Sequence, residues 1–144
     1  MNICYGANVP DESDLRLCGD LAGKRVIELG TAAIGHGVTP NAVVMAVAGA
    51  KAMALDPSAQ SIAAIRDAAA RNEVKVECHQ GELADLGFAT SGSVDVVVAS
   101  HTLEGVDDLP RLRRQVHRVL KPGASFVVAM RDRKSTRLNS SHRT

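Results

Sequence analysis

Five short apolar runs, separated by stretches with helical periodicity, constrain the fold of this chain more than any other feature of its sequence. Several runs are almost continuously apolar, which is typical of strands covered on both faces of a sheet. Strand followed by helix in regular alternation predicts a doubly wound, mostly parallel α/β sheet with right-handed crossovers and three α/β/α layers. The five predicted strands are residues 25–29, 51–55, 74–78, 94–99 and 125–130.

Helix signals lie between these runs. Thr39-Pro40 begins the first predicted helix with an N-cap and a proline at the first helical position, and Gly49 ends it. Two more helices are predicted over 58–71 and 109–120, and a shorter one over 11–21. Apolar residues recur on one face of the second and third helices, as packing against a sheet requires.

Composition excludes several classes of protein. With 144 residues, of which 45% are hydrophobic and 23% charged, the chain has the length and make-up of one globular domain. Aromatic residues make up only 2%, too few for a surface on which nucleic-acid bases stack, so no nucleic-acid partner is predicted. The formal net charge of +1 indicates no special partner.

The cysteines and the apolar segments indicate the compartment. Cys4, Cys18 and Cys78 lie at wide spacing without a CxxC pair or a Cys/His cluster, so no metal site is predicted. An odd number of cysteines fits a reducing, cytoplasmic compartment. The N-terminus carries no secretory signal, and the most apolar stretch, 42–50, is too short to span a bilayer. We therefore expect a soluble cytoplasmic protein with no membrane partner.

Polar residues and glycines follow each predicted strand. Ligands of open parallel sheets bind beyond the carboxyl ends of the strands, so these residues are the candidate site. Each has a plainer interpretation when taken alone, such as a turn glycine at Gly30 or a helix cap at Asp56, and only their order along the chain favours a site. The candidates are Glu28, Gly30, Gly35 and Gly37 after the first strand, Asp56 and Pro57 after the second, Gly81, Glu82, Asp85 and Leu86 after the third, and Ser100 and His101 after the fourth.

Carboxylates at these strand ends suit a cofactor that contains adenosine. A carboxylate after the second strand accepts two hydrogen bonds from ribose hydroxyls, and a glycine after the first lets the backbone approach a ligand. Nicotinamide cofactors and S-adenosylmethionine both meet this description. The first loop lacks the G-x-G-x-x-G dinucleotide fingerprint, and Glu28 would repel a pyrophosphate while attracting cationic sulfonium and amino groups. The electrostatics favour S-adenosylmethionine.

Five segments carry a resemblance to a known family. They are GKRVIELG at 23–30, LDPS at 55–58, QGELADL at 80–86, SVDVV at 93–97 and RQVHRVLKPGA at 114–124. In this order they resemble the motifs of class I S-adenosylmethionine-dependent methyltransferases, in the branch that methylates small molecules, over Tyr5 to Met130. The resemblance implies a Rossmann-like sheet of strand order 3-2-1-4-5, S-adenosylmethionine as cofactor and a small-molecule methyl acceptor.

The same resemblance implies roles for individual residues. In this chain the loop after Gly30 is longer than the family's closely spaced glycine loop, so whether Gly35 or Gly37 contacts the cofactor stays open. In the implied site, Glu28 and Gly30 line the methionine end, Asp56 holds the ribose, Asp85 faces the adenine, Ser100 lies near the transferred methyl, and His101 is a general base.

The C-terminal segment has a different character from the rest of the chain. Residues 132–142, DRKSTRLNSSH, have no hydrophobic period and resemble the translation of a sequencing-library adapter. We therefore expect an incomplete methyltransferase domain over 1–131, without the family's last two strands, and a non-native or disordered tail over 132–144. The fifth strand would then form an exposed apolar edge. An uninterrupted genomic read through the tail would contradict this hypothesis.

Two other functions remain open from the sequence. One is a catalytically silent, Rossmann-like cofactor-binding fragment, and the other is an NAD(P)-dependent oxidoreductase. Binding of S-adenosylhomocysteine, of NAD, or of neither distinguishes the three.

Overall fold

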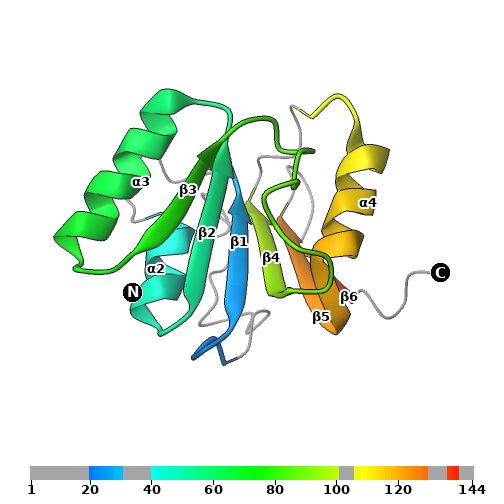
Figure 1. The fold of residues 1–144 in the computed structure, drawn as a ribbon, viewed down its shortest axis with the longest axis horizontal. Coiled ribbons are helices and arrows are strands. Elements are labelled where there is room, and N and C mark those ends of the chain that lie inside the picture. Colours follow the sequence, from blue (N-terminus) through cyan, green and yellow to red (C-terminus); the bar gives the residue numbers. More distant parts are fainter. Residues whose placement is uncertain (1–19, 31–39, 101–105, 130–135, 140–144) are drawn as a thin grey trace.

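The computed structural model describes residues 20–30, 40–100, 106–129 and 136–139. Six strands form one sheet in the order β3-β2-β1-β4-β5-β6 (Figure 1). The first five strands are parallel to one another, and the predicted order 3-2-1-4-5 is confirmed. The strands are β1 (Arg25–Leu29), β2 (Lys51–Asp56), β3 (Val76–Gln80), β4 (Val94–Ser100), β5 (Leu120–Ala129) and β6 (Thr136–Asn139).

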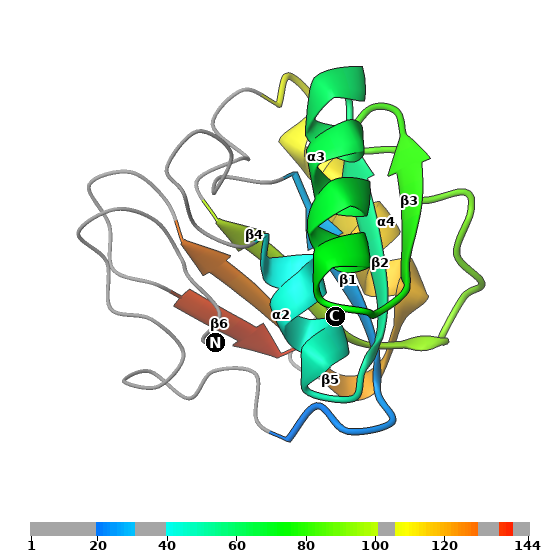
Figure 2. The ribbon, with the colours of Figure 1, turned by 90° about the vertical axis from the view of Figure 1, so that its left-hand side faces the viewer.

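Three helices lie between the strands of the described ranges. They are α2 (Asn41–Val47), α3 (Ala59–Arg71) and α4 (Leu109–Val119), each within a residue or two of the predicted span. Figures 1 and 2 show α2 and α3 beside the β1–β3 half of the sheet and α4 beside the β4–β5 half. The helix predicted over 11–21 falls almost wholly outside the described residues.

Alternate side chains of the central strands enter two separate hydrophobic cores. In β1, Val26 packs in a cluster with Met45 of α2 and Ile65 of α3. Ile27, the next residue, packs in a second cluster that contains Leu112 of α4. Because successive side chains of a strand point to opposite faces, this division places helices on both faces of the sheet. The predicted three-layer α/β/α architecture is confirmed.

The edge beside β5 differs from the prediction. The sequence predicted an exposed apolar edge, but β6 pairs antiparallel with Ser125–Val128 and places Leu138 opposite Phe126. The prediction of an exposed edge is therefore wrong over these residues, because backbone pairing requires only an extended segment beside the strand. The assignment of residues 132–144 to a non-native tail stays a prediction.

The start of α3 tests the capping argument. The Ser58 hydroxyl accepts a hydrogen bond from the backbone N–H of Ser61 at 3.3 Å, which satisfies one donor of the first turn. We expect Ser58→Ala to lower the free energy of unfolding by about 1 kcal/mol, since an N-cap serine contributes about that much. Urea denaturation measures the change. Ser61→Ala retains the donating N–H and is the matched control; an equal loss in both variants contradicts the capping role.

Candidate functional site

The candidate site lies where the carboxyl ends of β1, β2 and β3 meet. Beyond β1, the N–H of Gly30 donates to the carbonyl oxygen of Leu55 at 2.7 Å, and beyond β3 the N–H of Gly81 donates to that of Asp56 at 3.1 Å. These bonds continue the sheet pairing past the strands and hold the three ends together. Gly30 has φ of 72°, a left-handed conformation that a side chain would strain, so the turn requires glycine.

Glu28 is the most deeply buried charged side chain at this edge, with 1% of its surface exposed. Its Oε1 accepts a hydrogen bond of 2.9 Å from the backbone N–H of Ala42 in the first turn of α2. The N-cap residue of that helix, Pro40, makes no side-chain cap bond, so a carboxylate from the neighbouring strand takes the place of a local cap. Oε2 of Glu28 is buried and has no hydrogen-bond partner among the described residues.

Burial raises the pKa of Glu28 from 4.5 to about 8. The negative charge of Asp56 raises the pKa further, while the N–H groups of Ala42 and Asn41 act in the opposite direction. A carboxyl group in this state gains most from a cation placed beside it, because the cation stabilises the ionised form that burial disfavours.

Asp56 ends β2 and is 7% exposed. Its Oδ1 accepts the backbone N–H of Ser58 at 2.8 Å. Ser58, and not Asp56, caps α3, so the plainer interpretation of Asp56 as the helix cap does not hold. Instead Asp56 fixes the turn through Pro57, an exposed residue that lines the cavity described next.

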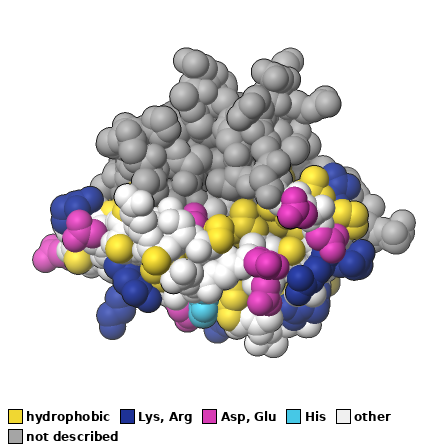
Figure 3. Space-filling model, turned by 90° about the horizontal axis from the view of Figure 1, so that it is seen from above, with side chains coloured by type: hydrophobic (Ala, Val, Ile, Leu, Met, Phe, Trp, Pro, Cys, Tyr) yellow, Lys and Arg dark blue, Asp and Glu magenta, His cyan; other side chains and the backbone are white. Residues whose placement is uncertain are grey.

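A cavity of about 500 Å³ adjoins these strand ends. Its walls are Pro57 after β2, residues 82–84 after β3, and residues 106–108 with Arg111 at the start of α4. Nη1 of Arg111 lies 4.0 Å from Oε2 of Glu82, so this long ion pair joins the two walls. Viewed from this edge, acidic side chains lie beside apolar ones (Figure 3).

The three residues predicted after Gly81 occupy different environments. Glu82 lines the cavity, whereas Asp85 does not; Asp85 is exposed and its Oδ1 accepts the N–H of Gly87 at 3.2 Å. Leu86 is fully buried in the hydrophobic core between the sheet and α4, where it packs against other apolar side chains and does not line the cavity. Sequence reasoning missed the α4 wall of the cavity. Asp108, the N-cap of α4, also lines the cavity, and the only signal for it was its place just before the predicted helix.

Some predicted site residues lie outside the described part of the chain. Gly35, Gly37 and His101 belong to this group, so their roles stay predictions. Ser100 is the last residue of β4 and pairs with Ala129 of β5. Within the described ranges, no group of three His, Cys, Asp or Glu residues is placed to hold a metal ion, and no helix has the length and apolarity needed to cross a membrane.

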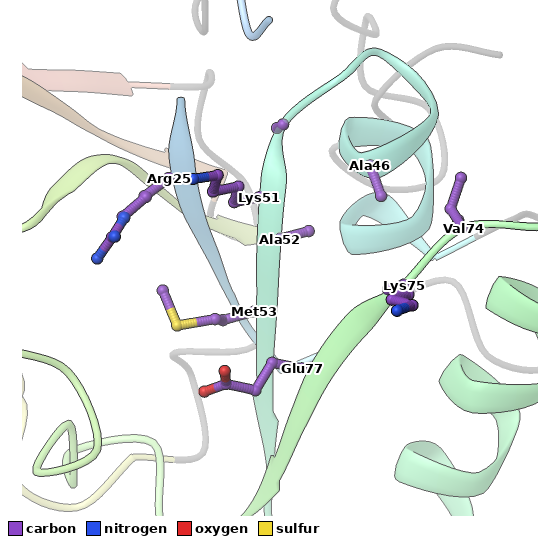
Figure 4. A pocket seen from close by; sticks show the side chains of 9 residues that line it. Arg25, Ala46, Lys51, Ala52, Met53, Val74, Lys75 and Glu77 are labelled. Carbon is purple, nitrogen blue, oxygen red and sulfur yellow. The ribbon is translucent and has the colours of Figure 1, made fainter. Parts of the chain in front are cut away.

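A second cavity, of about 540 Å³, lies at the opposite edge of the sheet. It is lined by residues at the start of β1 and β2 and before β3, among them Arg25, Lys51 and Lys75 (Figure 4). Since ligands of open parallel sheets bind at the carboxyl ends of the strands, this cavity is not the candidate site despite its larger volume.

Sequence comparison and structural comparison identify the same kind of protein. The chain is 32% identical over 119 residues to the ubiquinone biosynthesis O-methyltransferase of Sodalis glossinidius, covering 83% of this chain and 46% of that protein. It is 29% identical to the ubiquinone/menaquinone biosynthesis C-methyltransferase of Rubrivivax gelatinosus, covering 78% and 41%. The chain therefore spans less than half the length of these curated relatives.

Solved structures share the fold. An S-adenosylmethionine-dependent methyltransferase from Mesorhizobium loti superposes with a TM-score of 0.64 at 28% identity, over 81% of this chain and 50% of that one. The YcgJ protein of Bacillus subtilis superposes with a TM-score of 0.68 at 22% identity, over 81% and 47%, which shows the fold alone.

The sheet order, the two helical layers and these similarities define the class: a class I methyltransferase of the S-adenosylmethionine-dependent type. The family described as "Methyltransferase domain" matches residues 32–128, which is most of the chain. The chain belongs to that family.

Proposed function

We propose that this domain binds S-adenosylmethionine across the carboxyl ends of β1, β2 and β3 and supports transfer of its methyl group to a small molecule. The observation that carries the proposal is Glu28, a carboxyl group buried at a strand end with one oxygen that no described residue bonds. Such an oxygen is costly unless a ligand donates to it, and the cationic amino group of S-adenosylmethionine is a donor of the right charge.

The other carboxylates at this edge fit the rest of the cofactor. Asp56, whose Oδ1 is already oriented by the N–H of Ser58, would accept hydrogen bonds from the ribose hydroxyls. Glu82 and the apolar residues Leu83 and Val106 line the adjoining cavity, which supports adenine binding there. This proposal gives Glu82 the contact that the sequence motif had predicted for Asp85.

The chain contributes positioning more than reactive groups. S-adenosylmethionine supplies an activated methyl group, and Glu28, Asp56 and Glu82 would bind and orient it so that the acceptor approaches in line. His101, which follows the last residue of β4, is proposed as the general base that removes a proton from the acceptor.

The acceptor is proposed to be a small molecule. Both curated relatives are methyltransferases of ubiquinone or menaquinone biosynthesis, and the chain spans only part of their length.

Calorimetry with S-adenosylhomocysteine and with NAD tests the proposal directly. We expect S-adenosylhomocysteine to bind and NAD not to bind, because a cationic amino group beside Glu28 stabilises its ionised form, whereas a pyrophosphate at the end of β1 does not. Binding of NAD alone contradicts the methyltransferase proposal, and binding of neither ligand indicates a silent fragment. Circular dichroism of the same sample confirms that the chain tested is folded.

A further inference from the structure

We propose that Arg118, near the end of α4, is a positioning residue for the cofactor cavity, because its guanidinium ties the segment that carries one cavity wall to the helix that forms the other. The inference rests on the proposed function, since it assigns the cavity to the cofactor. Arg118 does not line the cavity itself, so its role would be indirect.

The guanidinium of Arg118 makes an unusually complete set of contacts for a half-buried side chain. Nη2 donates to the carbonyl oxygen of Leu86 at 2.8 Å, and Nη1 donates to that of Ala89 and to the hydroxyl of Ser91, both at 3.1 Å. Oε1 of Gln115, one turn earlier on the helix, accepts from Nη2 at 3.1 Å and from Nε at 3.4 Å. One cation therefore joins α4 to three residues of the segment after β3.

That segment needs such an anchor because it forms neither helix nor strand between β3 and β4. Turn bonds satisfy some of its backbone carbonyls, as where the N–H of Ala89 donates to Leu86, but the segment lacks the continuous ladder of bonds that secondary structure provides. Two main-chain bonds add to the attachment: the N–H of Gly92 donates to the carbonyl of Arg118, and that of Ser93 donates to the carbonyl of Val119, both at 2.9 Å.

The same helix also forms the opposite wall of the cavity. Asp108 and Arg111, at its start, line the cavity and face residues 82–84 of the anchored segment. Arg111 and Arg118 are seven residues apart, which places them on the same side of the helix and about 10 Å apart along its axis. The segment is therefore joined to α4 at two levels, by Arg118 firmly and by the long Arg111–Glu82 ion pair weakly.

The consequence is that Arg118 sets how far residues 82–84 lie from the start of α4. Without it, the apolar contacts of Leu83 and Leu86 and the main-chain bonds from Gly92 and Ser93 still hold the segment, but the carbonyls of Leu86 and Ala89 lose their bonds to α4. We infer that the cavity loses its defined width and binds the adenine end of the cofactor more weakly, while the rest of the fold persists.

The experiment compares the full chain with Arg118→Ala, Arg118→Lys and a control, Arg114→Ala. Arg114 is an exposed arginine of the same helix with no hydrogen bond or ion pair among the described residues. Hydrogen exchange of residues 85–93 without ligand tests the anchor, and calorimetry with S-adenosylhomocysteine tests its effect on binding. Both measurements are made at a temperature where circular dichroism shows every variant folded. If Arg118 only stabilised the fold, its replacement would leave the affinity unchanged under this condition.

We expect Arg118→Ala to accelerate exchange over 85–93 and to weaken binding about tenfold or more, since several charge-assisted hydrogen bonds are lost. Arg118→Lys should fall between, because an ammonium cannot bond both carbonyls as the planar guanidinium does. If Arg118→Ala does not fold, the exchange rates and affinities of Arg118→Lys are compared with those of Arg114→Ala instead. If the Arg118 variants bind S-adenosylhomocysteine as tightly as Arg114→Ala does, the inference is overturned. If Arg118→Ala accelerates exchange but the wild-type chain binds no S-adenosylhomocysteine, the anchor stands while the proposed function is overturned, and with it the role in a cofactor site.

Discussion

Asp56→Asn is expected to weaken binding of S-adenosylhomocysteine about 100-fold, since two charge-assisted hydrogen bonds to the ribose hydroxyls would be lost or weakened. The substitution retains Oδ1 as an acceptor for the N–H of Ser58, the bond that orients the turn after β2. The fold should therefore survive, and the loss should appear as affinity rather than stability. Calorimetry and thermal unfolding of the same samples separate the two.

Asp67→Asn is the matched control for Asp56→Asn. Asp67 is exposed on α3, where it makes an ion pair of 2.8 Å with Arg71. It carries the same charge at a distance from the strand ends, so a general electrostatic effect would appear in both variants. Equal affinities for Asp56→Asn and wild type would contradict the proposed ribose contact.

Glu28→Gln is expected to flatten the dependence of stability on pH. The pKa of Glu28 in the folded protein, about 8, lies above its ordinary value of 4.5, so the folded state binds the proton more tightly. The contribution of Glu28 to stability is fully present below the ordinary pKa of 4.5. It is lost as the pH rises towards the pKa of the folded state, about 8. Over that window the free energy of unfolding falls by up to about 1.4 kcal/mol per pH unit because of Glu28.

Urea denaturation of wild type and Glu28→Gln between pH 5 and pH 9 measures this contribution as a difference, which removes the effect of every other titrating group. Glutamine retains an oxygen for the N–H of Ala42 and carries no charge to bury. The two stability curves should converge at acidic pH and separate as pH rises, with the variant the more stable. Parallel curves would contradict the raised pKa.

The sequence predicted the architecture well because the signals were local and repeated. The span of α3 agrees with its prediction, since Ser58 is the N-cap and Asn72 the C-cap, and the predicted face with Ile62 and Ile65 is buried. Asp56 at the end of β2 was found in the same way, from an apolar run that stops at a carboxylate. These features depend only on residues that are neighbours along the chain, so a single sequence is enough to predict them.

The site was less predictable where it depends on the path of an irregular segment. Both Glu82 and Asp85 were predicted site residues, and a one-dimensional pattern does not show that only Glu82 of the two lines the cavity between β3 and α4. That path is set by distant contacts, above all the bonds from Arg118 to Leu86 and Ala89. A residue 32 positions away therefore decides it, and no local signal reports such a contact.

The pairing of β6 with β5 has a consequence for how this edge of the sheet behaves. The two strands are joined through their backbones, and every residue type except proline carries the groups that such a ladder uses. The position beside Ser125–Val128 is therefore defined by the backbone of β5, and extended segments of many different sequences could pair there. A segment with no evolutionary history in this fold would occupy it as readily as a native strand, and so would an extended segment from another molecule.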